Sequence, residues 1–313
     1  MSLSSKRPSF RSLVLPLTAA LALAVAVMLA TSLSGCGEEN PAKPSSNPAA
    51  PAAPEQVTSY TSRHPDISPD GTKLAMTLDN GGVAVASIDG SQLDTLAIIY
   101  AFDDPDWYPP DGSMIVVYGG GWLWRIDVDT KEVSALGSGD VDGDPEWSAD
   151  GSKIAAHTTM AGDGIGITTY PGGTWSILPC AKQDGSNCAG RGPTWAPDGS
   201  AIAFDDGYEI LRVPSSGGTA TVVVEGVGDL TRPSWSPDGN WIAFAVDSTN
   251  VGHGPWLAHI WVVDQRGMQY GLRQITFGPS YDSDPSWSPD SRTIYFSSGR
   301  GGFSAIWKVA VQP

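Results

Sequence analysis

One seven-residue pattern recurs six times along the chain, and this repetition limits the folds that the chain can adopt. Its clearest copy reads Pro-Ser-Trp-Ser-Pro-Asp-Gly, and residues rich in Ile, Ala and Phe follow each copy. The spacings between copies are 40, 40, 48, 40 and 52 residues, so one structural unit of about 40 residues is repeated. The copies begin at Pro65, Pro105, Pro145, Pro193, Pro233 and Pro285.

Each unit divides into four short β segments. In the fifth unit the expected strands are 234–236, 241–246, 259–264 and 272–276, because apolar and β-branched residues fill these segments and turn residues separate them. Residues 56–313 show no helical periodicity. Four-stranded units of about 40 residues are typical of propeller blades. The sequence therefore predicts an all-β fold, a six-bladed β-propeller of four-stranded antiparallel blades.

The two ends of the repeat region predict how the ring closes. The sixth unit supplies only three strands, and the counterpart of its missing fourth strand is the segment 55–59. We expect this N-terminal segment to pair with the outside of the last blade. Such pairing would cover a strand edge that is otherwise open to aggregation.

The repeated Trp-Ser-Pro-Asp-Gly, as in residues 235–239, resembles the PD40 repeat of TolB-family propellers. The resemblance covers residues 56–313 and implies a six-bladed propeller. The same repeat occurs in the propellers of prolyl oligopeptidase-like enzymes and of oligogalacturonate lyases. The resemblance therefore specifies the fold more closely than the function.

Residues 1–35 are expected to be a signal peptide. Three basic residues, Lys6, Arg7 and Arg11, precede an apolar run from Leu13 to Leu33. The run ends in Leu-Ser-Gly-Cys, which resembles the lipobox of bacterial lipoproteins and implies cleavage before Cys36 and acylation of that residue. The alternative is an uncleaved transmembrane anchor. Either way, a lipid bilayer is one partner of the chain.

Residues 36–55 are rich in Pro, Ala and Ser, and they predict a disordered tether ahead of the propeller. In enterobacterial lipoproteins an Asp after the lipidated Cys favours the inner membrane, and Gly37 stands there instead. The expected location is the cell envelope, with the outer membrane or the periplasmic side favoured.

Charge excludes one class of partner. Without the signal peptide, 15 Lys and Arg stand against 34 Asp and Glu, which gives a net charge near −19. Such a surface repels nucleic acid and favours solubility and cationic partners. We expect a monomeric propeller that binds no nucleic acid.

Two cysteines remain after Cys36, namely Cys180 and Cys188. Because they lie close together in an exported chain, a local disulfide is expected. A metal-binding pair and two free thiols are the alternatives.

The repeated residues have a structural interpretation. One tryptophan position recurs in five units and predicts packing between neighbouring blades, whereas the repeated aspartates predict turns. Ser291 replaces the turn glycine in the last unit and suggests a slightly different turn. The tryptophans are Trp107, Trp147, Trp195, Trp235 and Trp287, with Ile67 in the first unit. The aspartates are Asp70, Asp111, Asp150, Asp198, Asp238 and Asp290.

The residues just before each repeat proline differ between units and should surround the mouth of the central channel. Units two, three and six offer acids, and units one, four and five offer bases, so a polar binding funnel is predicted. Solvated charges with local pairing are the alternative. The candidates are Arg63, His64, Asp103, Asp104, Asp142, Asp144, Arg191, Arg232 and Asp284. His253 and Trp256, in the insertion 247–257, are expected on the same face.

No catalytic residue is predicted. The chain lacks a G-x-S-x-G motif, and its four histidines lack metal-ligand spacing. Asp140, Asp142 and Asp144 resemble the start of a calcium loop, without its Gly at position six and its Glu at position twelve. They are weak candidates for Ca²⁺, and no other cofactor is expected.

The sequence thus favours a non-catalytic envelope lipoprotein that binds a protein or peptide through the channel mouth. The alternative is a polysaccharide-binding or oligogalacturonate-lyase-like propeller acting on extracellular polymers. Its site would use Arg63, His64, Arg191 and Arg232. A structural spacer without a specific ligand is a third possibility.

Overall fold

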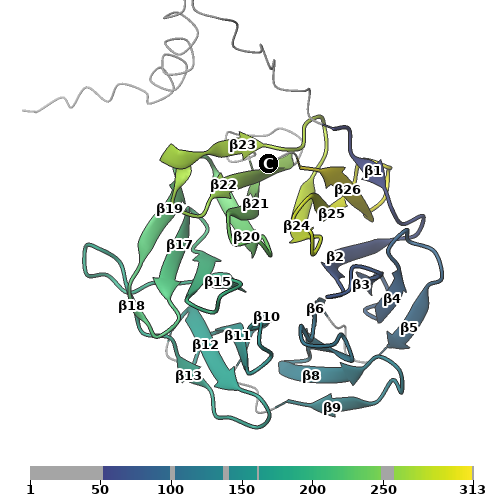
Figure 1. Ribbon diagram of the computed structural model, residues 1–313, viewed down its shortest axis with the longest axis horizontal. Coiled ribbons are helices and arrows are strands. Elements are labelled where there is room, and N and C mark those ends of the chain that lie inside the picture. The colour runs from purple at the N-terminus through teal and green to yellow at the C-terminus, as the bar shows by residue number, and fades with distance from the viewer. Residues whose placement is uncertain (1–51, 99–102, 137–140, 161, 248–256, 312–313) are drawn as a thin grey trace, which may run out of the picture. The chain divides into compact units, whose positions relative to one another are not determined.

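The computed structural model describes residues 52–98, 103–136, 141–160, 162–247 and 257–311. Six sheets of four antiparallel strands are arranged in a ring around a central channel (Figure 1). The predicted all-β, six-bladed propeller is therefore confirmed. In the described part of the chain, no helix is long and apolar enough to cross a bilayer.

The first three blades follow one another along the chain. Blade one comprises β2 (Ser62–Ile67), β3 (Lys73–Leu78), β4 (Val83–Ser87) and β5 (Asp94–Ala97). Blade two comprises β6 (Asp103–Trp107), β7 (Met114–Gly119), β8 (Trp122–Asp127) and β9 (Val133–Ala135). Blade three comprises β10 (Gly143–Trp147), β11 (Lys153–Thr158), β12 (Gly164–Thr169) and β13 (Ser176–Ile177).

The remaining blades complete the ring. Blade four comprises β15 (Arg191–Trp195), β16 (Ala201–Asp205), β17 (Glu209–Pro214) and β19 (Thr221–Glu225). Blade five comprises β20 (Asp229–Trp235), β21 (Trp241–Asp247), β22 (Ala258–Asp264) and β23 (Leu272–Gln274), with the 3-10 turn η2 (Met268–Tyr270) between its last two strands. Blade six comprises β24 (Asp282–Trp287), β25 (Thr293–Ser298) and β26 (Ala305–Ala310), joined by β1 (Glu55–Gln56).

The tryptophans fill the spaces between neighbouring blades, as predicted. The five repeat tryptophans are only 2–7% exposed. Trp107 of blade two packs against Ala75 and Val83 of blade one, and Trp235 of blade five packs against Ile210 of blade four. The second strands are buried on both faces, and all five residues of β16 are buried. Blade-to-blade packing therefore forms the core.

The repeated aspartates form the turns between the first and second strands. Asp70 Oδ1 accepts hydrogen bonds from the Thr72 N–H at 3.0 Å and from the Ser68 hydroxyl at 2.6 Å. The following glycine adopts a positive φ, as at Gly71 with φ +71°. Ser291 takes the same conformation with φ +58°, so the expectation of a different turn there is wrong.

The turn hydrogen bonds predict a measurable cost for Asp150→Ala. Asp150 Oδ1 accepts from the Ser152 N–H at 3.0 Å and from the Ser148 hydroxyl at 2.7 Å. Because the turn is exposed, we expect the free energy of unfolding to fall by only about 0.5–1 kcal/mol. Urea denaturation measures this change. Asp129→Ala, in another exposed turn, should stay within about 0.5 kcal/mol of the parent chain, and an equal loss in both variants would contradict the assignment.

The N-terminal strand closes the ring, as predicted. In β1, Glu55 pairs with Lys308 and Gln56 pairs with Trp307 of β26. The Val57 N–H then donates to the Ile306 carbonyl at 2.8 Å, and buried Thr58 accepts from the Ile306 N–H at 2.9 Å. We call residues 55–59 the latch. It passes so close to blade one that a Cβ on Gly90 would lie 2.1 Å from the Val57 carbonyl oxygen.

The disulfide between Cys180 and Cys188 is confirmed, and it excludes the metal pair and the free thiols. It lies in the connection from β13 to β15, where β14 (Cys180–Ala181) pairs with β18 (Gly218–Thr219). Cys36, Asp140, His253 and Trp256 lie outside the described residues.

Candidate binding channel

Two rings of side chains line the central channel, because the innermost strand of every blade begins at one end of it and runs toward the other. The mouth ring consists of the residue before each repeat proline, namely His64, Asp104, Asp144, Gly192, Arg232 and Asp284. The inner ring consists of the residue after each repeat proline, namely Asp66, Asp106, Glu146, Thr194, Ser234 and Ser286. We call the end at the mouth ring the mouth face and the end at the repeat turns the turn face.

A shared backbone conformation shapes the mouth ring. All six residues have φ between +50° and +53°, and each innermost strand changes register against its neighbour at this point. A left-handed conformation costs a non-glycine residue about 1–2 kcal/mol. Glycine, which adopts it freely, stands there only at Gly192, while the other five blades keep a charged or titratable side chain at this cost.

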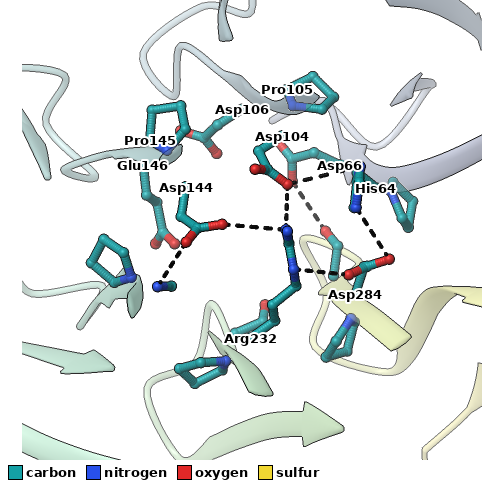
Figure 2. Close-up of a pocket in the computed structure, with 17 residues that line it drawn as sticks. His64, Asp66, Asp104, Pro105, Asp106, Asp144, Pro145, Glu146, Arg232 and Asp284 are labelled. Atoms are coloured by element: carbon teal, nitrogen blue, oxygen red, sulfur yellow. Dashed lines mark hydrogen bonds and ion pairs between the residues drawn. The ribbon is translucent and has the colours of Figure 1, made fainter. Parts of the chain in front are cut away.

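Arg232 stands at the centre of the mouth ring and contacts three carboxylates from other blades (Figure 2). Its Nη1 pairs with Asp104 and lies 3.4 Å from Asp144 Oδ1, while its Nε lies 3.1 Å from Asp284 Oδ1. One cation thus holds acids from blades two, three and six. These contacts cross the channel and tie together blades that are not neighbours.

His64 extends this network. Its Nδ1 pairs with Asp103, and its Nε2 lies 3.5 Å from Asp284 Oδ2. Burial lowers the pKa of His64, but the carboxylates of Asp284, Asp103 and Asp104 outweigh this effect and raise the pKa to about 9. Burial also raises the pKa of Asp104 to about 6, against the opposing charges of Arg232 and His64.

The inner ring links neighbouring blades through hydrogen bonds. Asp106 Oδ2 accepts from the Trp147 N–H at 2.7 Å, and Glu146 Oε1 accepts from the Trp195 N–H at 2.9 Å. Asp66 accepts in the same way from the Trp107 N–H at 2.9 Å. Burial raises the pKa of Glu146 to about 8 and that of Asp106 well above its ordinary value. The inner ring contains no basic residue.

Sequence reasoning missed the three inner-ring acids and Asp205. The signal for the acids was present, since the residue after the repeat proline is acidic in units one to three and hydroxylic in units four to six. Asp205 gave no signal, because it ends the apolar strand β16. It is 3% exposed and accepts from the Arg232 N–H at 3.1 Å, and burial raises its pKa to about 7.

The structure brings together only some of the predicted mouth residues. His64, Asp103, Asp104, Asp144, Arg232 and Asp284 form the network described above. Arg63 and Arg191 are exposed at the starts of their strands. Arg63 lines a separate cavity of about 510 Å³ that opens beside Arg232 and Asp284.

The two calcium candidates that the structure describes, Asp142 and Asp144, are not directed at one point. Asp142 Oδ2 accepts from the Thr159 N–H at 2.7 Å, whereas Asp144 lies in the channel beside Arg232. Among the described residues, His64, Asp103 and Asp104 bring possible ligand atoms within 4.8 Å of one another. Because Arg232 and His64 already compensate these carboxylates, the geometry favours an ion-pair network there. The calcium hypothesis stays a prediction.

The raised pKa values predict that the fold loses stability as the pH rises. Glu146 has a pKa of about 8 in place of 4.5, and His64 has a pKa of about 9 in place of 6.5. For each group, at a pH between its ordinary pKa and its raised pKa, the folded chain holds more protons than the unfolded chain. The free energy of unfolding should therefore fall by up to about 1.4 kcal/mol per pH unit for each group.

The pH ranges of Glu146 and His64 overlap between pH 6.5 and pH 8, where the free energy of unfolding should fall most steeply with pH. Urea denaturation at these two pH values measures it, and Glu146→Gln should flatten it while keeping the acceptor for the Trp195 N–H. Stability that is constant or increases with pH in the parent chain would contradict the prediction.

Comparison with known proteins points to one family. Residues 192–313, which form blades four to six, match the PD40 family, described as the TolB beta propeller domain. The Tol-Pal system protein TolB of Bordetella pertussis is 31% identical over 122 residues, which cover 38% of this chain and 26% of that protein. The match thus spans about a quarter of that relative's length.

Solved structures share the fold. TolB from Acinetobacter baumannii gives a TM-score of 0.56 at 16% identity, over 82% of this chain and 65% of that chain. The oligogalacturonate lyase from Vibrio parahaemolyticus gives a TM-score of 0.53 at 13% identity, over 82% of this chain and 92% of that chain. Identity this low supports the architecture and not the chemistry. With the repeat and the six blades described above, the chain is a six-bladed β-propeller whose residues 192–313 are similar to the TolB beta propeller domain.

Proposed function

We propose that this protein is a non-catalytic, lipid-anchored binding module of the bacterial cell envelope that holds a protein or peptide partner at its mouth face. The relative that matches the chain is a Tol-Pal system protein, which supports an envelope location and an envelope partner. The match spans only part of that relative, so the partner of this chain is left to experiment.

The observation that carries the proposal is the cavity of about 510 Å³ on the mouth face. Arg63 and Tyr281 lie in its wall, and Tyr281 is 42% exposed. Tyrosine and arginine are enriched among the residues that dominate protein interfaces. Four serines also line the cavity, and their hydroxyls form hydrogen bonds within the chain that hold the wall in place, namely Ser283, Ser297, Ser298 and Ser304.

The charges of the mouth ring fit binding better than catalysis. Arg232 and His64 are engaged by carboxylates on several sides, so neither is presented as a free acid or base. The network instead gives the channel mouth a rigid floor beside the cavity. A partner would contact Arg63 and Tyr281 above this floor.

The test is capture of partners from membrane extract by the immobilised full chain. We expect Arg63→Ala with Tyr281→Ala to abolish capture of at least one protein. A matched control exists on blade five, where Arg266 stacks over Tyr270 at 4.6 Å beside η2, away from the mouth cavity. The Arg266→Ala, Tyr270→Ala variant should keep the full partner set, and identical sets from both variants would argue against the mouth face.

The anchor is tested separately. Cys36→Ala should abolish the incorporation of labelled palmitate and release the protein from the membrane fraction. Labelling that persists in this variant would contradict acylation at Cys36.

A glycan is the second candidate ligand, because the same cavity combines the cation of Arg63 with the exposed ring of Tyr281, which suit an acidic sugar. A glycan array with and without Ca²⁺ distinguishes the two ligands. Binding of an acidic oligosaccharide that is lost in Arg63→Ala would favour this candidate, and a blank array would remove it.

A further inference from the structure

The turn face of the channel contains a second cavity, of about 380 Å³, which the mouth ring does not line. Its walls are formed by the five repeat tryptophans and by prolines of the repeat turns, including Pro69, Pro197 and Pro237. Ala149 takes the place of the proline in blade three. Its floor is the inner ring, so an apolar entrance leads to a polar end.

The floor holds three carboxyl groups without a base beside them. Burial raises the pKa values of all three, and a cation that enters the cavity would favour their ionised forms. Asp66, Asp106 and Glu146 come from three consecutive blades, and the other inner-ring residues are Thr and Ser. Arg232 does not compensate them, because its ion pairs go to the mouth ring. In Figure 2 those pairs are drawn to Asp104, Asp144 and Asp284, and none reaches Asp106 or Glu146.

Glu146 has one oxygen left for a ligand. Oε1 accepts from the Trp195 N–H at 2.9 Å and from the Thr194 hydroxyl at 3.0 Å, whereas Oε2 receives no hydrogen bond from the described residues. Trp147 lines the same cavity at 2% exposure, and its indole N–H lacks an acceptor in the described part of the chain. The cavity therefore offers an acceptor for a cation, and a buried donor without an acceptor lies in its wall residue Trp147.

The rim of the turn face is acidic as well. The six repeat aspartates adjoin the cavity's turn residues, and hydrogen bonds from their own turns hold their pKa values below the usual range. Neighbouring turns lie close together, since the Asp238 N–H donates to the Ser291 hydroxyl at 3.0 Å. A ring of ionised carboxylates thus surrounds the apolar entrance and attracts positive charge.

We propose that the turn-face cavity binds a basic side chain, lysine or arginine, of a polypeptide partner. The aliphatic stem packs against the tryptophan and proline walls, and the cationic end meets Asp106 and Glu146 at the floor. This site is separate from the mouth face and does not depend on the function proposed there.

The test is calorimetric titration of the full chain with the acetylated, amidated peptide Gly-Lys-Gly-Lys-Gly-Lys-Gly. The same peptide with norleucine in place of lysine keeps the stem and lacks the charge. We expect the lysine peptide to bind at least about tenfold more tightly than the norleucine peptide, because charge-assisted hydrogen bonds are lost. Equal affinity for both peptides would overturn the proposal.

Two variants locate the site. Asp106→Asn with Glu146→Gln keeps the acceptors for the tryptophan N–H groups and should weaken the lysine peptide at least about tenfold. If that variant does not fold, Ala149→Trp narrows the entrance from an exposed position and should weaken binding without changing charge. Unchanged affinity in whichever of these variants folds would overturn the proposal.

The mouth variant Arg63→Ala, Tyr281→Ala separates the two sites. It should bind the lysine peptide as the parent chain does, whatever the outcome of the extract experiment. Loss of peptide binding in this variant, with binding kept in Ala149→Trp, would place the basic side chain at the mouth face and refute the turn-face site.

Discussion

Replacing the latch, residues 55–59, with glycine and serine should lower the free energy of unfolding by about 3–5 kcal/mol. The replacement removes the side chains of Val57 and Thr58, and with them the hydrogen bond between the Ile306 N–H and the Thr58 hydroxyl. It also loosens the pairing of Val57 with Ile306 and exposes the edge of β26. The fold should then aggregate more readily on heating, because an open strand edge can pair with another chain.

Urea denaturation followed by circular dichroism measures the stability, and light scattering during heating measures aggregation. The control replaces η2 (Met268–Tyr270), which contains no buried residue, with glycine and serine. That control should change stability by less than about 1 kcal/mol. Equal stability of the latch variant and the parent chain would show that the ring closes without the N-terminal strand.

Arg232→Met should have the next largest effect, a loss of about 2–3 kcal/mol. The substitution leaves Asp104, Asp144 and Asp284 facing one another without their shared cation. Breaking a fully buried ion network costs about 3–5 kcal/mol, and the lower figure applies here because the Arg232 side chain is 36% exposed. Urea denaturation at pH 7 provides the measurement.

A compensating variant tests the cause. Combining Arg232→Met with Asp104→Asn, Asp144→Asn and Asp284→Asn removes the uncompensated charges and should restore most of the lost stability. Asn at position 144 keeps an acceptor for the Gly192 N–H, which donates to Asp144 at 3.2 Å. If the fourfold variant is less stable than Arg232→Met alone, repulsion between carboxylates is not the cause.

The architecture could be predicted because it depends on features that are local in the chain. Six copies of the repeat gave the number of blades, and the missing fourth strand of the last unit pointed to residues 55–59. The turn aspartates could be assigned because they accept hydrogen bonds from residues only two positions away, as Asp70 does from the Thr72 N–H. The expectation for Ser291 was wrong because this residue adopts the same positive φ as the repeat glycines. Its hydroxyl accepts a hydrogen bond from the Asp238 N–H of the neighbouring turn, a contact that is not local in the chain.

The chemistry of the channel was less predictable because it depends on residues that meet only in the closed ring. Arg232 and Asp104 are 128 residues apart in the chain, and nothing in either repeat unit indicates that one arginine serves three acids. Glu146 and Asp106 occupy the variable position between the repeat proline and the repeat tryptophan, and both line the channel. Burial then changes their protonation, which no spacing pattern encodes.

The position of the latch has a mechanical consequence. Everything ahead of residue 55 is connected to the ring through β1, so a pull on that end of the chain is transmitted first to the pairing of β1 with β26. Two residues of β1 pair with β26, whereas six residues of β25 pair with the same strand. Tension on the N-terminal end would therefore peel β1 away from blade six before any blade unravels.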